Sequence, residues 1–478
     1  MRKTKIVATL GPASDDPDVL KAMINAGMDV ARINFSHGTH DDVRKRVELV
    51  RTVTKEMGAV VALLADTKGP EIRLGTFEGG KAELVDDTVF TLTTEKVEGT
   101  ASKASITYDG LSKDIKSGTR ILLADGLIEL VAEHISSTSI TTRVIHGGTI
   151  SNAKSVNVPG VSLSMPYISG KDRSDLRLIC ELGFHFIAAS FVRSDEDIRL
   201  IREELHRMNG DRINIIAKIE NAEGVENADA ILAVVDGLMV ARGDLGVELP
   251  FEELPAIQKE LIKKAYRQGK NVITATEMLE SMITKPRPTR AETSDVANSI
   301  YDGTSAVMLS AETSVGKFPV EAIQTMAKIA VQTENDIDYK DRCITSTYKP
   351  EPSVTNAISH AAVTTAHDLE AAAILIVSKS GQTSRNVSKF RPQCQIIGGT
   401  PDEIVMNQLQ LAWGVIPVLT QEELNSADMI SGAINASLEE KLISEGDLII
   451  ITAGIPVGQS GTTNLIKVHE VGEKLAVF

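Results

Sequence analysis

The chain has 478 residues, and its 50 basic and 65 acidic side chains give a formal net charge of −15 at pH 7. Its 42% apolar and 24% charged residues are typical of soluble globular proteins and exclude a disordered or fibrous chain. No apolar run approaches the ~20 residues that cross a bilayer, the N-terminus lacks a signal-peptide cleavage pattern, and the acidic excess disfavours nucleic-acid binding. The three widely spaced cysteines fit neither a disulfide framework nor a zinc site. We expect a cytoplasmic protein without nucleic-acid or membrane partners.

Short apolar runs alternate with helical patterns over the first 340 residues. Each run is almost continuously apolar, as expected of parallel strands buried on both faces. The predicted strands are 5–10, 29–35, 60–66, 184–190, 213–219, 237–241, 271–276 and 305–310. Helical spacing occurs at 17–27, 41–57, 195–209, 252–268, 289–301 and 319–335. This alternation predicts an α/β fold built on a (β/α)8 TIM barrel, formed by residues 1–70 and 166–340.

Residues 71–165 interrupt the alternation between the third and fourth predicted strands. They contain the short strand patterns FTLTT, SITYDGL, RILLADGLIEL and TTRVI, separated by Gly and Asp, without a clear helix. We therefore expect an inserted small β-barrel domain. It leaves the barrel at the carboxyl end of a strand, the face on which such barrels carry their active sites, so it is placed to act as a lid.

A second alternating pattern occupies residues 341–478. Strand patterns occur at 371–380, 395–400, 414–419, 447–454 and 464–471, with helical stretches at 353–368, 383–390, 402–412 and 426–443. This pattern predicts a smaller C-terminal α/β domain with a mainly parallel sheet. Because no low-complexity linker precedes it, we expect it to pack against the barrel.

Polar side chains gather where the predicted barrel strands end. One such residue carries little information, but a ring of them from seven strands is what a barrel active site requires. The ring consists of Arg32, Asn34, Ser36 and His37; Asp66, Thr67, Lys68, Glu71 and Arg73; Ser190 and Arg193; Lys218 and Glu220; Arg242 and Asp244; Thr276 and Glu277; and Ser310 and Glu312.

Glu220 and Asp244 are the best candidates for divalent-metal ligands. Mg²⁺ prefers one or two protein carboxylates, with water and substrate oxygens completing its shell. For either carboxylate alone, a helix cap or a salt bridge is the alternative. Lys218, between apolar residues and close to Glu220, suits charge stabilisation on a transferring phosphoryl group. Schiff-base chemistry and a structural pair with Glu220 are the competing interpretations of this lysine.

Short oxygen-bearing side chains follow two adjacent strands at Asn34, Ser36, Asp66 and Thr67. Oxygen ligands with a single carboxylate suit a hard cation of low charge, although the same residue types also form turns and caps. Arg32 and Arg73 supply forked donors that match carboxylate or phosphate. The sequence contains neither a Ser–His–Asp arrangement nor a Walker-type phosphate loop.

The chain resembles the pyruvate kinase family through long motifs that occur in the family's order. The motifs are TKIVATLGP, RINFSHG, DTKGPEIR, VPGVSLSMP, KIENAEG, VARGDLGVE, ITATEMLESM and PRPTRAETSDVANSIYDGT, and the resemblance covers essentially the whole chain. It implies transfer of a phosphoryl group from phosphoenolpyruvate to ADP, giving ATP, and protonation of the enolate to pyruvate in glycolysis. The implied cofactors are K⁺ and Mg²⁺ or Mn²⁺.

The resemblance also assigns roles to individual residues. The metal ligands that it implies are Glu220 and Asp244 for Mg²⁺, and Asn34, Ser36, Asp66 and Thr67 for K⁺, with Glu71 marking potassium dependence. The implied substrate-binding residues are Arg32, Lys218, Gly243, Asp244 and Thr276. Those facing the nucleotide are Asn34, His37, Arg73 and Lys154, with Asp125 in the lid. The implied catalytic residues are Lys218 and Arg73, Thr276 at the face where the enolate is protonated, and Ser310 and Glu312 in a nearby proton relay.

The segment SKSGQTSR at 378–385 resembles the family's phosphate-binding effector loop. The residues concerned are Ser378, Lys379, Ser380, Gly381 and Thr383; an ordinary strand–helix turn is the alternative. Where some members carry basic and aromatic residues for the second phosphate of fructose 1,6-bisphosphate, this chain has SADMISGAINA and AGIPVGQSG. This difference favours a monophosphate activator such as AMP or a sugar phosphate. The resemblance further suggests a homotetramer.

Four positions depart from the family's usual residues. Glu277 stands in place of glutamine, Ser305 in place of aspartate, and both Ala311 and Ser155 in place of glycine. None removes a proposed catalytic group, so we expect effects on local packing and rate.

Two other functions compete with the kinase. One is a Mg²⁺-dependent carbon–carbon lyase of the phosphoenolpyruvate/pyruvate barrel group, which needs neither a nucleotide lid nor a monovalent cation. The other is an inactive barrel that only binds an effector. Retention of the proposed catalytic residues weighs against the inactive barrel.

Overall fold

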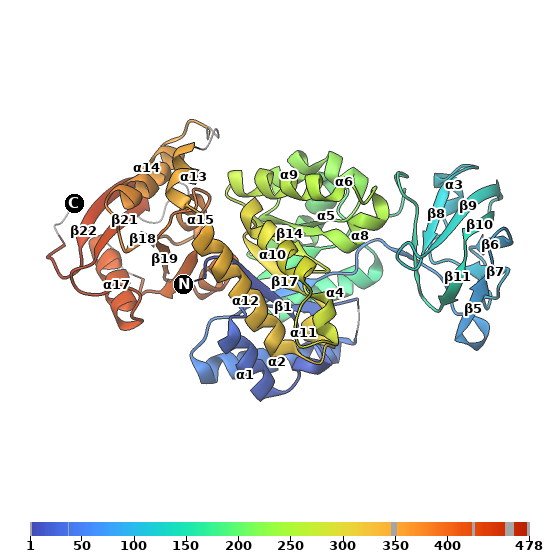
Figure 1. Ribbon diagram of the computed structural model, residues 1–478, viewed down its shortest axis with the longest axis horizontal. Helices are drawn as coiled ribbons and strands as arrows, with labels where there is room; N and C mark the ends of the chain where they lie inside the picture. Colours follow the sequence, from blue (N-terminus) through green and yellow to red (C-terminus); the bar gives the residue numbers. More distant parts are fainter. Residues whose placement is uncertain (1, 37, 346–350, 423–425, 455–462, 476–478) are drawn as a thin grey trace.

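The computed structural model describes residues 2–36, 38–345, 351–422, 426–454 and 463–475. Its parts form a row (Figure 1): the barrel lies in the centre, the β-rich insertion at one end and the C-terminal α/β part at the other. Within the described ranges, no helix is long and apolar enough to cross a membrane.

Eight parallel strands close into a barrel in the order β1-β17-β16-β15-β14-β13-β3-β2. They are β1 (Lys5–Thr9), β2 (Val30–Asn34), β3 (Ala62–Asp66), β13 (Phe186–Ala189), β14 (Asn214–Ile219), β15 (Gly237–Ala241), β16 (Asn271–Ala275) and β17 (Ala306–Leu309). The barrel prediction is therefore confirmed, and each predicted strand agrees within two residues at either end. The strands are continuously apolar because one face packs inside the barrel and the other against the helices.

Helices surround the barrel, and several of them begin at a capping residue. Thr39, Ser169 and Thr289 each form a reciprocal capping box with an acidic residue three positions later. The helices are α1 (Pro17–Ala26), α2 (His40–Met57), α4 (Gly170–Glu181), α5 (Asp195–Arg207), α6 (Ala222–Glu226), α7 (Ala228–Val234), α8 (Arg242–Glu248), α9 (Leu254–Arg267), α10 (Arg290–Asp302), α11 (Ala311–Ser314) and α12 (Pro319–Asp336).

The insertion forms its own sheet with its own apolar core, which includes Phe90, Leu92 and Ile121. Seven strands follow the order β4-β12-β8-β9-β10-β6-β7, and a Leu74–Ile106 bridge joins the two outer edges. A separate pair is formed by β11 and β5. The elements are β4 (Ile72–Arg73), β5 (Lys81–Leu84), β6 (Val89–Thr93), β7 (Lys103–Ser105), α3 (Leu111–Asp114), β8 (Arg120–Leu123), β9 (Ile128–Ile135), β10 (Ser139–His146), β11 (Gly148–Ser151) and β12 (Ser155–Asn157).

The C-terminal part has a five-stranded sheet in the order β20-β19-β18-β21-β22, in which only β22 is antiparallel to its neighbour. The mainly parallel sheet that we expected is therefore confirmed. Its elements are α13 (Tyr339–Thr345), α14 (Val354–Asp368), β18 (Ala373–Val377), α15 (Gln382–Ser388), β19 (Gln395–Thr400), α16 (Glu403–Leu409), β20 (Val415–Leu419), α17 (Ser426–Glu439), β21 (Leu448–Gly454) and β22 (Thr463–Glu470).

This C-terminal part covers the amino end of the barrel. Leu411 is fully buried and clusters with the interior barrel residues Val7, Leu64 and Phe186. Gln410 Nε2 donates to the carbonyl of Val60, just before β3. Because one end of the barrel is covered in this way, the opposite, carboxyl end is the face that remains for a site.

Candidate active site

Lys218 lies near the carboxyl end of β14 and is held by three oxygens. Its Nζ is 2.7 Å from Ser190 Oγ, 3.0 Å from Asp66 Oδ1 and 3.0 Å from Glu220 Oε1. Burial favours the neutral amine, but the Asp66 and Glu220 carboxylates outweigh it and raise the pKa of Lys218 above its ordinary value. The side chain is therefore a permanent cation. An imine-forming lysine must be a neutral nucleophile, so this environment disfavours the Schiff-base interpretation.

Glu220 is fully buried, and one of its oxygens lacks a directed donor. Oε2 accepts from the backbone amide of Phe191 at 2.7 Å, whereas Oε1 lies 3.0 Å from Lys218 Nζ without hydrogen-bond geometry. Burial is the main cause that raises the pKa of Glu220, and the Asp244 and Asp66 charges raise it further. The Lys218 charge acts in the opposite direction. A bound cation would relieve this cost.

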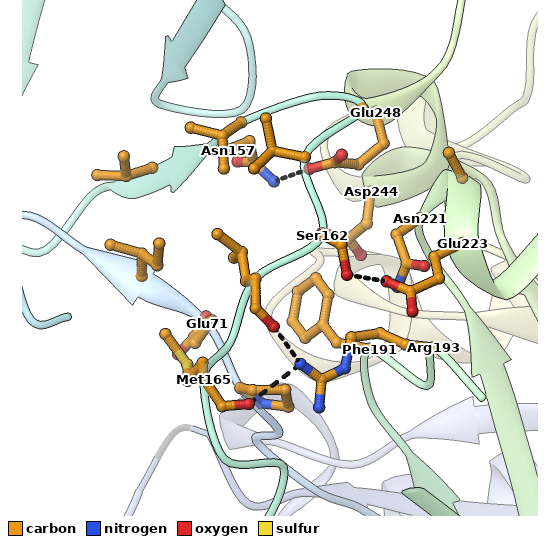
Figure 2. Close-up of a pocket in the computed structure, with 18 of the residues that line it drawn as sticks. Glu71, Asn157, Ser162, Met165, Phe191, Arg193, Asn221, Glu223, Asp244 and Glu248 are labelled. Carbon is orange, nitrogen blue, oxygen red and sulfur yellow. Dashed lines mark hydrogen bonds between the residues drawn. The ribbon is translucent and has the colours of Figure 1, made fainter. Parts of the chain in front are cut away.

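Asp244 supplies the second carboxylate of this region. It lies in the first turn of α8 and lines the pocket between the inserted domain and the barrel (Figure 2). Across the described ranges, no group of three or more His, Cys, Asp and Glu side chains forms a metal cage. Two carboxylates, one with an unsatisfied buried oxygen, fit Mg²⁺, which retains positions for water and substrate.

Asp66 links Lys218 to Arg32. Its Oδ2 accepts from Arg32 Nε at 2.7 Å, and Arg32 Nη1 also donates to Thr9 Oγ1 at 2.7 Å. Although burial opposes ionisation, the Arg32 and Lys218 charges hold the pKa of Asp66 below its ordinary value. The carboxylate is therefore ionised between two fixed cations.

The residues of the predicted potassium site lie on β2 and β3 or just after these strands. Strand register pairs Asn34 directly with Asp66 across β2 and β3. Asn34 Oδ1 accepts from the backbone amide of Ser36 at 2.9 Å, and Ser190 Oγ donates to the Thr67 carbonyl at 2.7 Å. Neutral oxygens around one ionised carboxylate fit a monovalent cation.

Arg73 stands where the chain enters the inserted domain. It makes a two-pronged pair with Glu71, Nε–Oε1 2.8 Å and Nη2–Oε2 2.7 Å, and its Nη1 donates to the Ala153 carbonyl at 2.8 Å. Lys154, next to Ala153, is exposed. The structure thus places Arg73 and Lys154 close together along the chain contacts of the inserted domain.

Thr276 and Gly243 meet at the ends of β16 and β15. The Gly243 amide donates to Thr276 Oγ1 at 2.7 Å, and Thr276 has φ = 67°, a conformation that is rare for a β-branched residue. Nearby, both oxygens of Glu312 accept backbone amides, from Ser310 at 2.7 Å and from Leu279 at 3.1 Å. In this arrangement Glu312 fixes two loops.

A cavity of about 490 Å³ separates the inserted domain from the barrel and includes Glu71, Arg73 and Asp244 in its wall (Figure 2). Three contacts connect its two sides. Asn157 Nδ2 donates to Glu248 Oε1 at 3.0 Å, Ser162 Oγ donates to Glu223 Oε2 at 3.0 Å, and Arg193 Nη1 donates to the Leu163 and Met165 carbonyls at 2.9 and 3.1 Å.

Comparisons with known proteins decide the family. Residues 1–323 match the profile of the pyruvate kinase barrel domain, and residues 356–469 match that of the pyruvate kinase alpha/beta domain. The chain belongs to the pyruvate kinase family. The sequence motifs indicated this phosphotransferase family. Membership in it supports the kinase function over the lyase alternative.

Individual pyruvate kinases resemble the chain over its full length. It is 48% identical to the pyruvate kinase of Sporosarcina psychrophila over 478 residues, which cover 100% of this chain and 82% of that protein. It is also 48% identical to that of Geobacillus stearothermophilus, with 99% and 81% covered. A crystal structure of a pyruvate kinase from Cryptosporidium parvum superposes with a TM-score of 0.92 at 39% identity, covering 98% of this chain and 96% of that one.

The positions that depart from the usual pyruvate kinase pattern have local partners in the structure. Ser155 Oγ donates to Asp125 Oδ1 at 2.7 Å and accepts from the Asp125 amide at 2.9 Å, which holds a turn where Asp125 has φ = 58°. Ser305 is buried and accepts from the Val272 amide at 3.2 Å. Glu277 is exposed with φ = 53°, and Ala311 begins α11.

Other predicted pyruvate kinase residues are only partly described. His37 lies outside the described residues, as does most of the segment AGIPVGQSG. The predicted effector residues lie in the connection from β18 to α15, except Thr383, which lies in α15. In this connection Gly381 has φ = 69° and Lys379 Nζ lies 2.6 Å from Glu422 Oε1. Thr383 shares a hydrogen bond of 2.8 Å with Thr463.

Sequence reasoning assigned no role to two residues that organise this pyruvate kinase site. Ser190 was recognised at a strand end, but its contact with Lys218 depends on which side chains cross the barrel. Arg242 was recognised in the same way, and its partners come from residues 275–295. Their positions at strand ends allow both residues to be predicted near the site. The side chains that they contact cannot be predicted from the sequence.

Proposed function

We propose that the protein transfers the phosphoryl group of phosphoenolpyruvate to ADP, giving ATP, and protonates the enolate to pyruvate, as a step of glycolysis. The observation that carries this proposal is the Lys218 ammonium, held between Asp66 and Glu220 beside a carboxylate oxygen that lacks a directed donor. Phosphoryl transfer needs fixed positive charge around the moving group, and this position supplies it.

Each residue has a part in that reaction. Lys218 stabilises charge on the transferring group, and Arg32 and Arg73 hold phosphate oxygens. Glu220 and Asp244 would hold Mg²⁺ or Mn²⁺, which neutralises phosphate charge when bound. We assign Thr276 to the face where the enolate is protonated and the backbone amides around Gly243 to the substrate carboxylate; the Gly243 amide itself donates to Thr276 Oγ1 in this structure. We assign Ser310 and Glu312 to a proton relay near this face; Glu312 also accepts the Ser310 and Leu279 backbone amides.

The remaining assignments concern the second cation, the nucleotide and regulation. We assign K⁺ to Asn34, Ser36, Asp66 and Thr67, with Glu71 as the sign of its requirement, and the nucleotide to Asn34, His37, Arg73 and Lys154. A phosphorylated effector is assigned to Ser378, Lys379, Ser380, Gly381 and Thr383. The proposal includes a cytoplasmic homotetramer and closure of the inserted domain as a lid.

An assay of pyruvate and ATP formation tests this function. Purified protein should convert phosphoenolpyruvate and ADP only when Mg²⁺ or Mn²⁺ is present, and replacing K⁺ by Na⁺ should lower the rate at least about tenfold, because a smaller ion fits the same oxygens less well. Absence of turnover with both ions and several phosphorylated effectors would contradict the function. Equal rates in Na⁺ and K⁺ would remove the potassium site alone.

A further inference from the structure

Arg242 is a buried arginine at the end of β15 with 8% of its surface exposed. Its guanidinium joins helix α10 to the loop that follows β16. Nη1 pairs with both oxygens of Asp295 on α10, at 2.7 and 2.6 Å. On the other side, Nη2 donates to the Thr276 carbonyl at 2.6 Å.

The same guanidinium makes further contacts within the loop that follows β16. Nε donates to the Ala275 carbonyl at 3.3 Å, and Nη2 lies 2.9 Å from Met278 Sδ. Arg242 thus contacts Ala275, Thr276 and Met278. A planar group with donors in fixed directions holds such a set more rigidly than an ammonium can.

The loop that Arg242 grips has an unfavourable backbone. Thr276 and Glu277 both have positive φ, 67° and 53°. Such conformations are unfavourable for residues with a side chain and persist only where surrounding contacts impose them. The Thr276 carbonyl is the group through which this restraint acts, and Gly243, the residue after Arg242, fixes Thr276 Oγ1 from the other side at 2.7 Å.

We propose that Arg242 is a positioning residue for the protonation step: it holds Thr276 in its left-handed conformation and thereby fixes the position of Thr276 Oγ1, which donates to the Ala275 carbonyl at 2.6 Å. This inference rests on the proposed function, because it uses the role of Thr276 at the enolate. Arg242 itself touches no substrate, and its charge is neutralised by Asp295.

Arg242→Lys is the first test. Lysine keeps the positive charge for Asp295 but cannot reach Asp295 and the Thr276 carbonyl together. We expect kcat to fall about 10- to 100-fold, with the KM values for phosphoenolpyruvate and ADP within about twofold of wild type, because a lost transition-state interaction lowers kcat selectively. Arg202→Lys is the matched control, since Arg202 also joins an acid, Asp236, to a backbone carbonyl, that of Ile213, but at the amino end of the barrel.

A double-mutant cycle with Thr276→Ala separates positioning from a general structural role. If Arg242 acts through Thr276, Arg242→Lys should cost less than about twofold once Thr276 is alanine, because the two losses are not additive. Full additivity, an equal loss in Arg202→Lys, or an unchanged kcat in Arg242→Lys would each overturn the inference.

A milder variant covers the case in which Arg242→Lys folds poorly. Asp295→Asn keeps Arg242 but weakens the ion pair that anchors it. We expect this variant to lower kcat by a smaller factor than Arg242→Lys does, and only when Thr276 is present. In the presence of Mg²⁺, K⁺ and ATP, the pyruvate methyl protons should exchange with D₂O, and NMR measures the rate of this exchange. We expect the exchange rate to fall in parallel with kcat. An unchanged exchange rate in Asp295→Asn and Arg242→Lys contradicts the positioning role. Failure of the wild type to make ATP from phosphoenolpyruvate would instead contradict the proposed function.

Discussion

At the scale of single residues, burial moves titratable groups in opposite directions according to their partners. Lys218 is buried beside two carboxylates, so its charge is retained. His185 is largely buried at the amino end of β13, where its Nδ1 accepts from the Leu63 amide at 2.8 Å, and burial with the nearby Arg51 lowers its pKa to about 4. The charge of Lys218 belongs to the proposed reaction, whereas the low pKa of His185 makes the stability of the fold depend on pH.

The low pKa of His185 predicts a loss of stability in acid. Between its unfolded pKa of about 6.5 and about 4 in the folded state, only the unfolded chain binds the proton, so stability falls as pH falls through this window. From pH 7.5 to 5 the loss is about 2 kcal/mol, at 1.36 kcal/mol per pKa unit. Denaturant unfolding gives the free energy of unfolding of wild type and of His185→Asn at each pH. The difference between the two values should fall by about 2 kcal/mol from pH 7.5 to pH 5. The exposed His206 provides the control variant, His206→Asn; a difference for His185→Asn that is independent of pH contradicts the account.

At the scale of elements, the strand ends carry the site and the inserted domain rests on it through few contacts. Figure 2 shows Asn157 of β12 reaching Glu248 of α8, and Ser162 reaching Glu223 of α6. Burial raises the pKa of Glu248 even though Asn157 donates to it. The orientation of the insertion thus depends on a partly desolvated acid whose hydrogen bond comes from Asn157.

Removal of that donor tests the lid. Asn157→Ala should speed hydrogen exchange in residues 158–166 and raise the KM for ADP about fivefold, since one such bond contributes about 1 kcal/mol. Thr149→Ala is the control, because Thr149 Oγ1 bonds to Glu83 Oε2 at 2.6 Å inside the same domain. Equal effects of both variants, or no change in exchange, would show that the contact with Glu248 does not hold the insertion in place.

The sequence was informative about elements and less so about partners. Buried parallel strands need apolar residues on both faces, so all eight barrel strands were readable, and polar residues after them marked the site face. The contacts of Arg242 and Ser190 were not readable, because they cross between strands whose register only the closed barrel sets. The roles of Glu220 and Asp244 were proposed from residue type; the unsatisfied Glu220 oxygen emerged only from the structure.

At the scale of the whole molecule, the C-terminal part joins the barrel through a cluster that contains the chain's single tryptophan. Trp413 packs against Tyr339. The Arg391 guanidinium carbon lies over the Trp413 ring, 4.5 Å from the ring centre. Arg391 is buried, which lowers its pKa to about 9, and it donates to the Gly303 carbonyl at the end of α10. The net charge of −15 describes the chain as a whole. At the carboxyl end of the barrel Arg32, Arg73 and Lys218 are each paired with a carboxylate.

The most direct test of the central claim is the turnover of Lys218→Met with phosphoenolpyruvate and ADP. We expect kcat to fall by about 10³-fold or more, because a preorganised charge at the transferring group is lost, while phosphoenolpyruvate still binds in the presence of Mn²⁺. Lys5→Met is the matched control, since Lys5 is also a buried lysine, but its Nζ bonds to the Val415 carbonyl at the other end of the barrel; its kcat should stay near wild type. A Lys218→Met enzyme that turns over at the wild-type rate would contradict the account.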